Sequence, residues 1–359
     1  MAEVLKNVYN TDFYDALVKR ILTHYPSFAS KAFLKAIFCP AFTTMELKAR
    51  MRHTTHCLHQ FLPKNYKEAI NILTPASEVP SNSFANMFFP DFVECYGMND
   101  IETSMNALEH FTKFSSSEFA IRPFIINDME NSMRTMLGWS TNENHHVRRL
   151  ASEGCRPKLP WAMALTAFQK DPSPILPILE NLKNDSSEYV RRSVANNLND
   201  ISKDHPVLVL SITKKWIGKS NHTDRLLKHA CRTLLKQGNA EALALFGFNE
   251  AKGVNISNVK WNSEKIEIGT SGYFSFNMHT EKAQNLRLEY AIDFLKSNGT
   301  HNKKVFRVSE KSYTKAQEIN IKKKHSFKQM STRKHYSGKH YLEIICNGKV
   351  LKRIAFELH

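Results

Sequence analysis

The chain of 359 residues carries 50 Lys and Arg against 34 Asp and Glu, a formal net charge of +16 at pH 7. Its length predicts two or three domains, and its charge favours nucleic acid as the partner, with an acidic membrane surface as the alternative. The first ten residues lack the basic start and apolar run of a secretory signal, and no span of about eighteen apolar residues occurs, so we expect a soluble cytoplasmic protein.

The helical part runs from Asp12 to about Phe246. Apolar residues recur there at three and four positions, which is the periodicity of amphipathic helices packed on one another. The segment from Thr74 to Ser83 contains two prolines and has the composition of a loop, so we expect a break between helices there.

The cysteines and histidines of the helical part show no strong metal pattern. Six cysteines lie far apart in the chain without a CxxC pair, which predicts free thiols. One compact group resembles a set of metal ligands, but its spacing is compressed on one helix and no second ligand pair follows; it comprises His53, His56, Cys57 and His59. A zinc site is therefore the weaker alternative to a structural role for these residues.

A repeat organises the second half of the helical part. Four polar residues each precede an apolar residue by five positions, and an arginine follows the first three of these apolar residues; the polar residues are Ser116, Asn142, Asp185 and Asn221. Spacings of 43 and 36 between the last three match two-helix HEAT-type units, whereas the first spacing of 26 is too short for a full unit. We predict an α-α superhelix, a HEAT-like repeat solenoid of three repeats behind an irregular first unit, with a plain helical bundle as the alternative.

Stacked repeats place equivalent positions in columns. One column takes Arg149 to Arg192 and Lys228, and its neighbour takes Glu153 to Asn196 and Arg232. Because positions i, i+4 and i+7 of a helix share a face, we expect a cationic and polar face on which Glu153 is the exception. The solenoid residues that we expect to contact DNA are Arg148, Arg156, Arg191, Arg192, Asn196, Lys228 and Arg232.

The segment from residue 147 to residue 161 concentrates what cleavage of a glycosidic bond requires. In Arg149-x-x-x-Glu153-x-x-Arg156 the carboxylate lies between two guanidinium groups, which hold it ionised and oriented. The prolines that follow predict that Trp161 begins the next helix. An exposed indole there would stack on a cationic base, and burial between helices is the alternative.

Two further carboxylates are candidates for the same site. Asp200 ends the equivalent helix one repeat later and would face the same groove, unless it is a solvated residue before Lys203. Glu118 is the third candidate, although Ser115 and Glu118 also fit a capping box, which is a structural role. A purine alkylated at N3 is already a good leaving group, so carboxylates that stabilise the positive sugar and direct water suffice, together with an aromatic wall.

After Gly247 the sequence changes to eight short alternating runs, from VKW and KIEIG to VLKRIAFEL. They predict an immunoglobulin-like β-sandwich of about seven strands, in which Asn347-Gly348 is a hairpin signal. We therefore predict a multidomain protein, α then β, with the helical domain at residues 1–250 and the sandwich at residues 255–359.

The predicted sandwich is strongly basic. From Asn255 to His359 the sequence holds 20 basic and 9 acidic residues, more than a structural appendage requires. Its candidates for contact with phosphate are Lys322, Lys323 and Lys324, and a solvated loop is the alternative for this tract.

Three segments resemble the AlkC family of bacterial alkylpurine DNA glycosylases: SSSEFAIRPFI, HHVRRLASEGCRPKLPWA and DPSPILPILENLKNDSSEYVRRSVANNLNDISKDHP. The resemblance covers essentially the whole chain, including the immunoglobulin-like tail of one branch of the family. It implies a HEAT-like solenoid related to the AlkD enzymes, excision of 3-methyladenine and similar cationic bases from bent duplex DNA, and no metal or organic cofactor. The residues that it carries over as lesion-site residues are Glu118, Arg149, Glu153, Trp161 and Asp200.

The sequence therefore favours a DNA glycosylase that acts as a monomer and leaves an abasic site. A non-catalytic HEAT-repeat protein that binds bent or damaged nucleic acid is the alternative, and an RNA-binding solenoid also fits the charge. The carboxylates favour the enzyme, because Glu153 and Asp200 would only repel phosphate in a pure binder. These two rank together as the principal catalytic group, with Glu118 in support.

Overall fold

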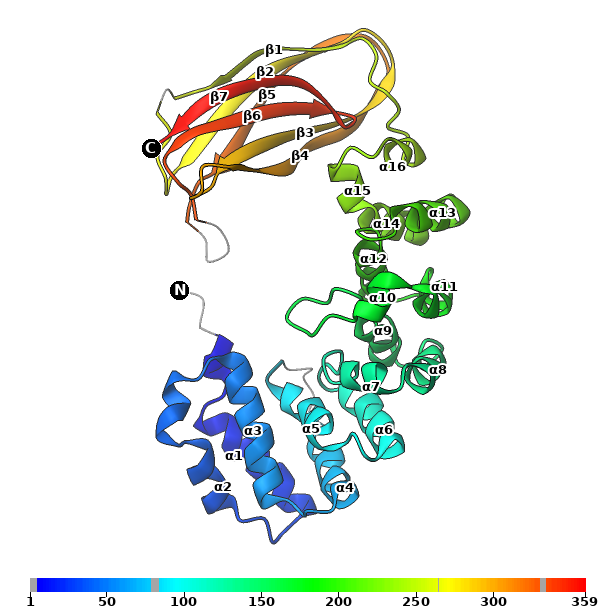
Figure 1. The fold of residues 1–359 in the computed structure, drawn as a ribbon, viewed down its shortest axis with the longest axis vertical. Helices are drawn as coiled ribbons and strands as arrows, with labels where there is room; N and C mark the ends of the chain where they lie inside the picture. The colour runs from blue at the N-terminus through cyan, green and yellow to red at the C-terminus, as the bar shows by residue number, and fades with distance from the viewer. Residues whose placement is uncertain (1–4, 79–83, 264, 330–333) are drawn as a thin grey trace. The chain divides into compact units, whose positions relative to one another are not determined.

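The computed structural model describes residues 5–78, 84–263, 265–329 and 334–359. Within these ranges helices occupy the chain as far as Leu245, and strands begin at Val254 (Figure 1). The predicted fold class, a helical repeat region followed by a β-sandwich, is confirmed. No helix of the described ranges is long and apolar enough to cross a membrane.

The α-helices of these ranges are α1 (Thr11–His24), α2 (Ser30–Ile37), α3 (Leu47–Phe61), α4 (Tyr66–Ala76), α5 (Phe88–Tyr96), α6 (Ile101–Thr112), α7 (Arg122–Asn127), α8 (Met129–Trp139), α9 (His145–Gly154), α10 (Thr166–Lys170), α11 (Leu176–Leu182), α12 (Glu188–Ile201), α13 (Pro206–Trp216), α14 (Asn221–Ala230), α15 (Arg232–Lys236) and α16 (Ala240–Leu245). Short 3-10 helices are η1 (Leu5–Val8), η2 (Pro40–Thr44), η3 (Phe84–Met87) and η4 (Ser173–Ile175).

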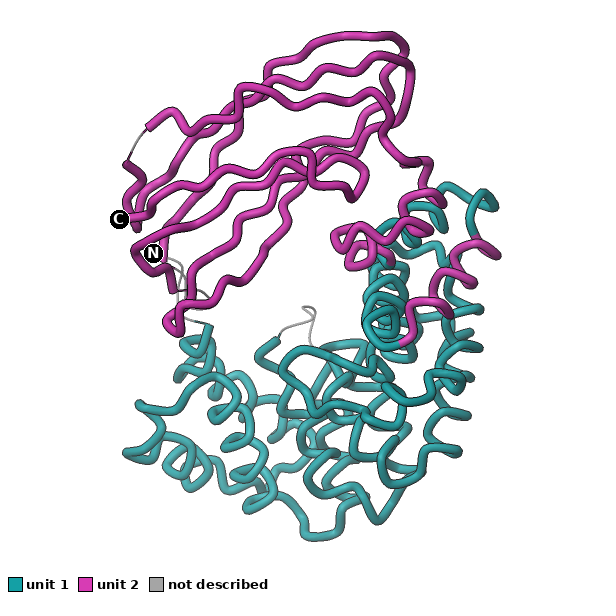
Figure 2. The backbone as a smooth tube through the Cα atoms, turned by 45° about the horizontal axis from the view of Figure 1, so that its top comes forward, with its two compact units in different colours: residues 1–204, 217–230 teal, residues 205–216, 231–359 magenta. Residues whose placement is uncertain are grey.

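The chain divides into two compact units, coloured separately in Figure 2. The helical unit comprises Met1–Asp204 and Ile217–Ala230, and the sandwich unit comprises His205–Trp216 and Cys231–His359. The predicted boundary near residue 250 lies between the last helix, which ends at Leu245, and the first strand, which begins at Val254. The compact sandwich unit also includes helices α13, α15 and α16.

The predicted break at Thr74 begins later than the sequence indicates. Helix α4 continues through Pro75 to Ala76, and the N–H of Ser77 still donates to the carbonyl of Leu73 at 3.0 Å. A proline in the last turn removes only one donor, so it does not end the helix before it. Residues 79–83 of the predicted loop lie outside the described residues.

The loops that precede α9 and α12 are built alike, as the repeat predicts. Asn142 Oδ1 accepts the N–H of Asn144 at 2.9 Å, and Asp185 Oδ1 accepts the N–H of Ser187 at 2.8 Å. Each polar side chain lies three residues before its helix and closes a turn there, which explains why an Asx residue recurs at this position.

An arginine in the first turns of each helix stabilises the loop before it by donating hydrogen bonds to its carbonyl oxygens. Arg148 donates to the carbonyl oxygens of Asn142 and Glu143, and Arg191 donates to those of Asp185 and Ser186. Arg148 also forms a two-point ion pair with Asp185, at 2.6 and 3.0 Å, and so connects neighbouring repeats.

Helices α9, α12 and α14 pack in series. Between α9 and α12 the hydroxyls of Ser152 and Ser193 lie 2.6 Å apart, and the Asn197 amide donates to the Ser152 carbonyl at 2.8 Å. The apolar repeat positions Val147 and Val190 are fully buried in this stack. Hydrophobic burial and these hydrogen bonds together fix the spacing of the repeats.

The sandwich consists of two antiparallel sheets, ordered β1-β2-β5 and β4-β3-β6-β7. The strands are β1 (Val254–Trp261), β2 (Ser271–Thr280), β3 (Gln284–Leu295), β4 (His301–Tyr313), β5 (Gln317–Ser326), β6 (Gly338–Cys346) and β7 (Lys349–Leu358). Its core contains Phe274, Phe276, Leu288, Ile292 and Leu342. Alternate residues of the facing strands fill the space between the sheets.

Two details of the predicted strands can be compared with the structure. Asn347 and Gly348 have φ angles of 43° and 82°, so the predicted two-residue hairpin turn is confirmed. The run KIEIG, predicted as a strand, is not one in the described residues: Ile266 makes only an isolated bridge to Leu358.

Candidate active site

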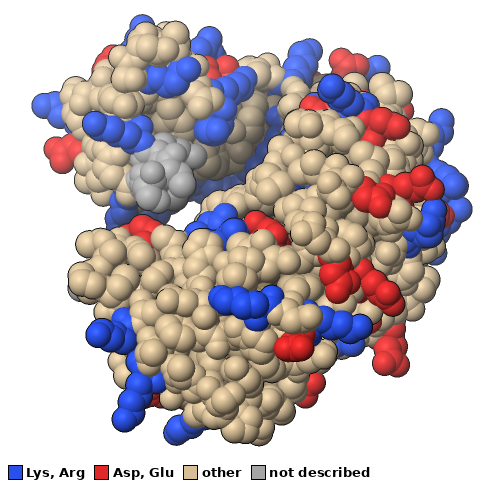
Figure 3. Space-filling model, turned by 60° about the horizontal axis from the view of Figure 1, so that its bottom comes forward, with Lys and Arg blue, Asp and Glu red and all other residues tan. Residues whose placement is uncertain are grey.

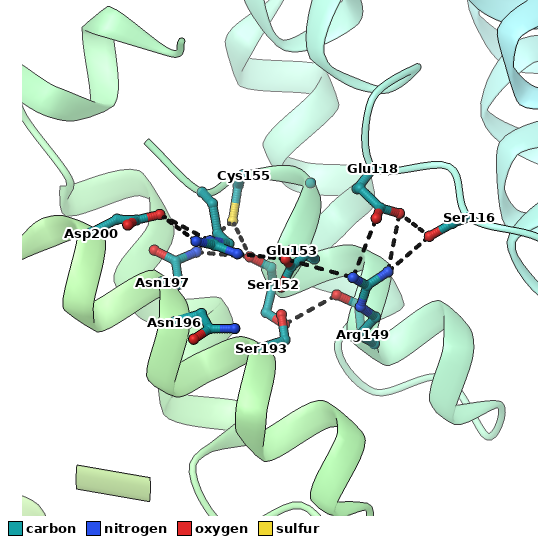
Figure 4. Close-up of polar contacts among 12 residues, drawn as sticks. Ser116, Glu118, Arg149, Ser152, Glu153, Cys155, Ser193, Asn196, Asn197 and Asp200 are labelled. Carbon is teal, nitrogen blue, oxygen red and sulfur yellow. Dashed lines mark hydrogen bonds and ion pairs between the residues drawn. The ribbon is translucent and has the colours of Figure 1, made fainter. Parts of the chain in front are cut away.

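Three carboxylates and three cations alternate in one line of contacts within the helical unit. Figure 4 labels the three carboxylates and one of the cations, Arg149. We call this line the charge network; its members, in order, are Glu118, Arg149, Glu153, Arg156, Asp200 and Lys203. All three carboxylates predicted from the sequence are therefore brought together by the fold.

The first half of the charge network is centred on Arg149 of α9. Its Nη1 lies 3.0 Å from Glu118 Oε2, and its Nη2 lies 3.6 Å from Glu153 Oε1. Nη1 also donates to the Ser116 hydroxyl at 2.9 Å, and that hydroxyl donates to Glu118. The guanidinium carbon lies 5.0 Å from the centre of the Tyr189 ring, so an aromatic face covers the cation.

The second half of the charge network joins two repeats. Arg156 Nη1 lies 2.6 Å from Glu153 Oε1, and both Nε and Nη2 of Arg156 lie 2.9 Å from Asp200 Oδ2. Lys203 donates to the other oxygen, Asp200 Oδ1, at 2.9 Å. The two repeats are thus connected by a charged path at the ends of α9 and α12.

Burial makes these contacts stronger than surface ion pairs. The side chains of Arg149, Glu153 and Asp200 are 15%, 7% and 2% exposed. Burial alone lowers the pKa of Arg149 and Arg156, but the neighbouring carboxylates outweigh it and raise the pKa of both above the usual range. The two guanidinium groups therefore stay charged.

Glu153 differs from the other two carboxylates in how its oxygens are used. Both guanidinium contacts to Glu153 use Oε1, and no hydrogen bond from the described residues engages Oε2. Both oxygens of Glu118 accept from Arg149, and both oxygens of Asp200 accept from cations. Glu153 is thus the carboxylate of the charge network with one oxygen that accepts no hydrogen bond from the described residues.

Trp161 is exposed, so the alternative of burial between helices is wrong. Its side chain is 67% exposed, and its φ of 67° lies in the left-handed region. It does not begin a helix as predicted, because α10 starts only at Thr166. The residue lies in the loop from residue 155 to residue 165, which projects from the helices in Figure 1. A left-handed conformation costs an L-residue about 1–2 kcal/mol, so other contacts hold this one.

The loop of Trp161 is anchored at two points. Lys48 of α3 donates to the Trp161 carbonyl oxygen at 2.8 Å. Arg122, fully buried, donates to the carbonyl oxygens of Gly154, Arg156 and Met163. Two distant parts of the chain therefore hold this strained loop.

Two local structures expected from the sequence, a capping box at Ser115 and a helical position for Arg156, do not form. The capping box of Ser115 and Glu118 does not form, because no helix begins there and the Glu118 carboxylate turns to Arg149 instead. Arg156 does not continue α9 as the i+7 spacing implies. It follows Cys155, which caps the helix, and still reaches Glu153.

The predicted cationic column is not uniform. Arg149 is enclosed by carboxylates, whereas Arg192 is 69% exposed on its side chain and lies 3.3 Å from Glu188. Lys228 lies on α14, and Arg232 begins α15 after a break at Cys231, so these two do not share one continuous helix. The predicted cationic face therefore carries negative as well as positive side chains, because Arg149 and Arg192 both lie beside carboxylates.

A groove of about 520 Å³ opens between α12 and α14. Its charged and imidazole-bearing lining residues are Glu188, Arg191, Arg192, His222, Arg225 and His229. The side-chain oxygen of Asn196 accepts a hydrogen bond from His229 Nε2 at 3.2 Å near this groove. Arg191 and Arg192 thus face an open, mostly basic surface, whereas Arg148 is engaged by Asp185 between repeats.

The basic tract of the sandwich lies on strand β5 and not in a loop. Lys322 and Lys324 are exposed and share one face of the strand, while Lys323 points to the other face and donates to the Val308 carbonyl at 3.3 Å. Figure 3 shows Lys and Arg side chains over the visible face of both units, with Asp and Glu side chains among them.

Two histidines of α3, His53 and His59, have structural contacts. His53 Nε2 lies 3.1 Å from the carbonyl oxygens of Ala36 and Ile37, and His59 stacks on Tyr96 with ring centres 3.8 Å apart. Among the described residues no three His, Cys, Asp or Glu side chains are grouped to hold a metal ion. His145 and His146 form the first turn of α9.

Sequence reasoning missed several contributors to the site. Lys203 follows Asp200 by three positions, a helical spacing that signals such a pair. Ser116, Tyr189 and Lys48 are brought to the site by tertiary packing alone, and nothing in the local sequence indicates their contacts.

Comparisons with known proteins agree with this architecture. Residues 255–359 match the family described as "Uncharacterised protein YhaZ, C-terminal Ig-like domain". The chain is 44% identical over 354 residues to "Uncharacterized protein YhaZ" of Bacillus subtilis (strain 168), covering 99% of each chain. It also resembles the structure of the Pseudomonas fluorescens alkylpurine DNA glycosylase AlkC bound to DNA containing an abasic site analog, with a TM-score of 0.95, 38% identity and 99% of each chain covered.

These findings place the protein among helical-repeat proteins that carry an immunoglobulin-like domain. Within that class, the chain belongs to the AlkC family.

Proposed function

We propose that the protein is a DNA glycosylase that hydrolyses the N-glycosidic bond of alkylated bases in double-stranded DNA and leaves an abasic site. The observation that carries the proposal is the charge network, which buries three carboxylates among cations in a chain of the AlkC family. The exposed indole of Trp161, five residues after Arg156, supplies an aromatic surface for a base.

The proposed substrates are cationic bases such as 3-methyladenine. A base that already carries a positive charge leaves without being protonated, so the site needs no strong general acid. Stacking on Trp161 favours such a base over a neutral one through cation–π attraction. The proposal thus explains why the charge network contains carboxylates but no group placed to act as an acid.

Glu153 is the proposed principal carboxylate. Arg149 and Arg156 hold its Oε1, which leaves Oε2 to face the positive charge that develops on the deoxyribose. Water bound to Oε2 adds to C1′ as the bond from C1′ to the base breaks. The electrons of that bond leave with the base and neutralise its charge, and the proton released from the water passes to the carboxylate or to solvent.

Asp200 and Glu118 keep the geometry of Glu153 in this proposal. Asp200, with Lys203, fixes Arg156, and Glu118 fixes Arg149. The proposed DNA contacts lie on the groove of α12 and α14, through Arg191 and Arg192, and on the exposed face of β5, through Lys322 and Lys324.

The test is release of free base from methylated duplex DNA by the purified protein in the presence of a chelator, followed by chromatography. We expect release of 3-methyladenine and a remaining abasic site. Binding of the same DNA without release of any base would overturn the glycosylase proposal in favour of a non-catalytic binder. Competition with duplex RNA at fixed salt tests the choice of DNA.

A further inference from the structure

Arg122 is a fully buried arginine that contacts backbone carbonyl oxygens. Its Nε donates to the carbonyl of Met163 at 2.7 Å, and its Nη1 donates to those of Gly154 and Arg156, both at 2.9 Å. No ion pair within the described residues joins it to a carboxylate, and its Nη2 has no hydrogen-bond partner there. A buried cation with one unused donor is unfavourable by itself.

The three acceptors of Arg122 lie on both sides of one loop. Gly154 ends α9, Arg156 starts the outgoing side of the loop, and Met163 lies on its returning side. Trp161 lies between the two sides. The guanidinium therefore closes the base of the loop that carries the exposed indole.

Only an arginine supplies these contacts from one side chain. A guanidinium presents several donors in a fixed planar fork, whereas an ammonium is a point charge on a flexible stem. Burial lowers the pKa of Arg122 to about 10, which still leaves it charged near neutral pH. The loop is thus held by charge-assisted hydrogen bonds that lysine cannot reproduce.

The tip of the loop has a separate anchor. The indole of Trp161 is mostly exposed, so packing does not fix its direction, and its φ of 67° is strained. The ammonium of Lys48 donates to the carbonyl of this strained residue at 2.8 Å and lies 5.2 Å from the centre of the Phe119 ring. Helix α3, more than one hundred positions earlier in the chain, thereby holds the peptide of Trp161.

We infer that Arg122 and Lys48 are positioning residues that fix the Trp161 loop against the charge network, so that the indole meets a base while Glu153 faces its sugar. The inference rests on the proposed function. Neither side chain needs to touch DNA for this role. Both act through the backbone of the loop, and their loss displaces the indole without removing a reacting group.

The test compares Arg122→Lys and Lys48→Gln with the matched control Arg50→Lys. Arg50 is likewise a buried arginine that donates to three backbone carbonyls, those of Lys6, Thr43 and Met45. We expect Arg122→Lys to lower the single-turnover rate of base release by about tenfold to a hundredfold. Affinity for duplex DNA with an abasic-site analogue should change by less than about threefold in the same variant.

A second readout follows the loop directly and does not depend on catalysis. The chain has four tryptophans, so the emission of Trp161 is the difference between each protein and its Trp161→Phe partner. We expect acrylamide quenching of that difference signal to change in Arg122→Lys and in Lys48→Gln but not in Arg50→Lys.

The outcomes separate the inference from the proposed function. If the wild-type protein releases no base, the proposed function fails, while the quenching experiment still tests the loop. The positioning role would be overturned if both loop variants kept the quenching and the rate of base release of the wild-type protein. It would also be overturned if Arg50→Lys lost as much of the rate as the loop variants do. Because Lys48 is exposed, its variant tests the inference even if Arg122→Lys does not fold.

Discussion

Each unit of the protein buries an arginine beside two carboxylates, and the two clusters differ in what surrounds them. In the sandwich, Arg287 of β3 forms ion pairs with Glu289 of the same strand and with Glu310, its partner position on β4. In the helical unit, Arg149 lies between Glu118 and Glu153. Buried ion pairs alone therefore do not identify an active site in this protein.

The helical cluster has three features that favour an active-site role over a purely structural one. Its contacts continue through Arg156 to a third carboxylate, and the loop that follows presents an exposed indole. One carboxylate oxygen of Glu153 also has no hydrogen bond in the described residues. In the sandwich, Glu289 is 1% exposed between strands, which fits a role in stability.

The substitution Glu153→Gln makes the sharpest test of this comparison. We expect the rate of base release to fall roughly a thousandfold, because the carboxylate no longer stabilises the sugar cation or orients water. Affinity for DNA should stay the same or improve, since a negative charge near phosphate is lost. The measurements are single-turnover base release at saturating protein and binding to an abasic-site duplex. An equal fall in rate and affinity would contradict the assigned role.

Glu289→Gln is the matched substitution in the sandwich. Removing the charge of Glu289 leaves the buried Arg287 with Glu310 as its remaining ion-pair partner in the described residues, and we expect a loss of up to about 3 kcal/mol in the free energy of unfolding. Thermal or denaturant unfolding measures this loss. Base release by the folded variant should be unchanged, and a fall comparable to that of Glu153→Gln would show that the two clusters are not functionally different.

Trp161→Ala tests the exposed aromatic surface. Loss of stacking on a cationic base should cost about 1–2 kcal/mol, which is roughly tenfold in affinity for DNA that contains the lesion. Because the side chain is exposed, the free energy of unfolding should hardly change. If Trp161→Ala binds the lesion-containing duplex and the undamaged duplex as tightly as the wild-type protein does, the indole does not contribute to lesion binding.

The sequence predicted the local parts of this site correctly and missed the distant ones. Glu153 lies four positions after Arg149 on α9, so this contact follows from helical spacing, whereas Arg156 reaches Glu153 from just beyond the end of the helix. The contact of Arg156 with Asp200 could be anticipated only through the repeat, which places the ends of α9 and α12 together. No spacing indicates that Lys48 reaches Trp161.

The repeat pattern also did not predict the contacts of Arg122, which lies in the irregular first unit. Arg122 occupies the same position of the sequence repeat as Arg148 and Arg191, which hold the turns of their own repeats. Because that unit is too short for a full repeat, the side chain of Arg122 turns instead to the loop after α9. A positive φ at a tryptophan carries no sequence signal either, since such strain is imposed by tertiary contacts.

The smallest expected effect is on DNA binding, when the exposed lysines of the sandwich are replaced. Lys322 and Lys324 lie on the exposed face of β5, and the Lys324 ammonium is 5.5 Å from the centre of the Tyr273 ring, whereas Lys323 is engaged with the Val308 carbonyl. If the exposed face contacts phosphates, Lys322→Ala and Lys324→Ala each weaken DNA binding evenly across sequences. Each should also lower the slope of log affinity against log salt by about one unit.

Lys323→Ala is the control on the same strand, and it should leave that slope unchanged. The measurement is a salt titration of duplex binding for the three variants at equal temperature and pH. Equal slopes in all three would mean that β5 does not lie on DNA, and the positive charge of the sandwich would then act only as a long-range attraction. A lower slope for Lys323→Ala alone would reverse the assignment of the two faces of the strand.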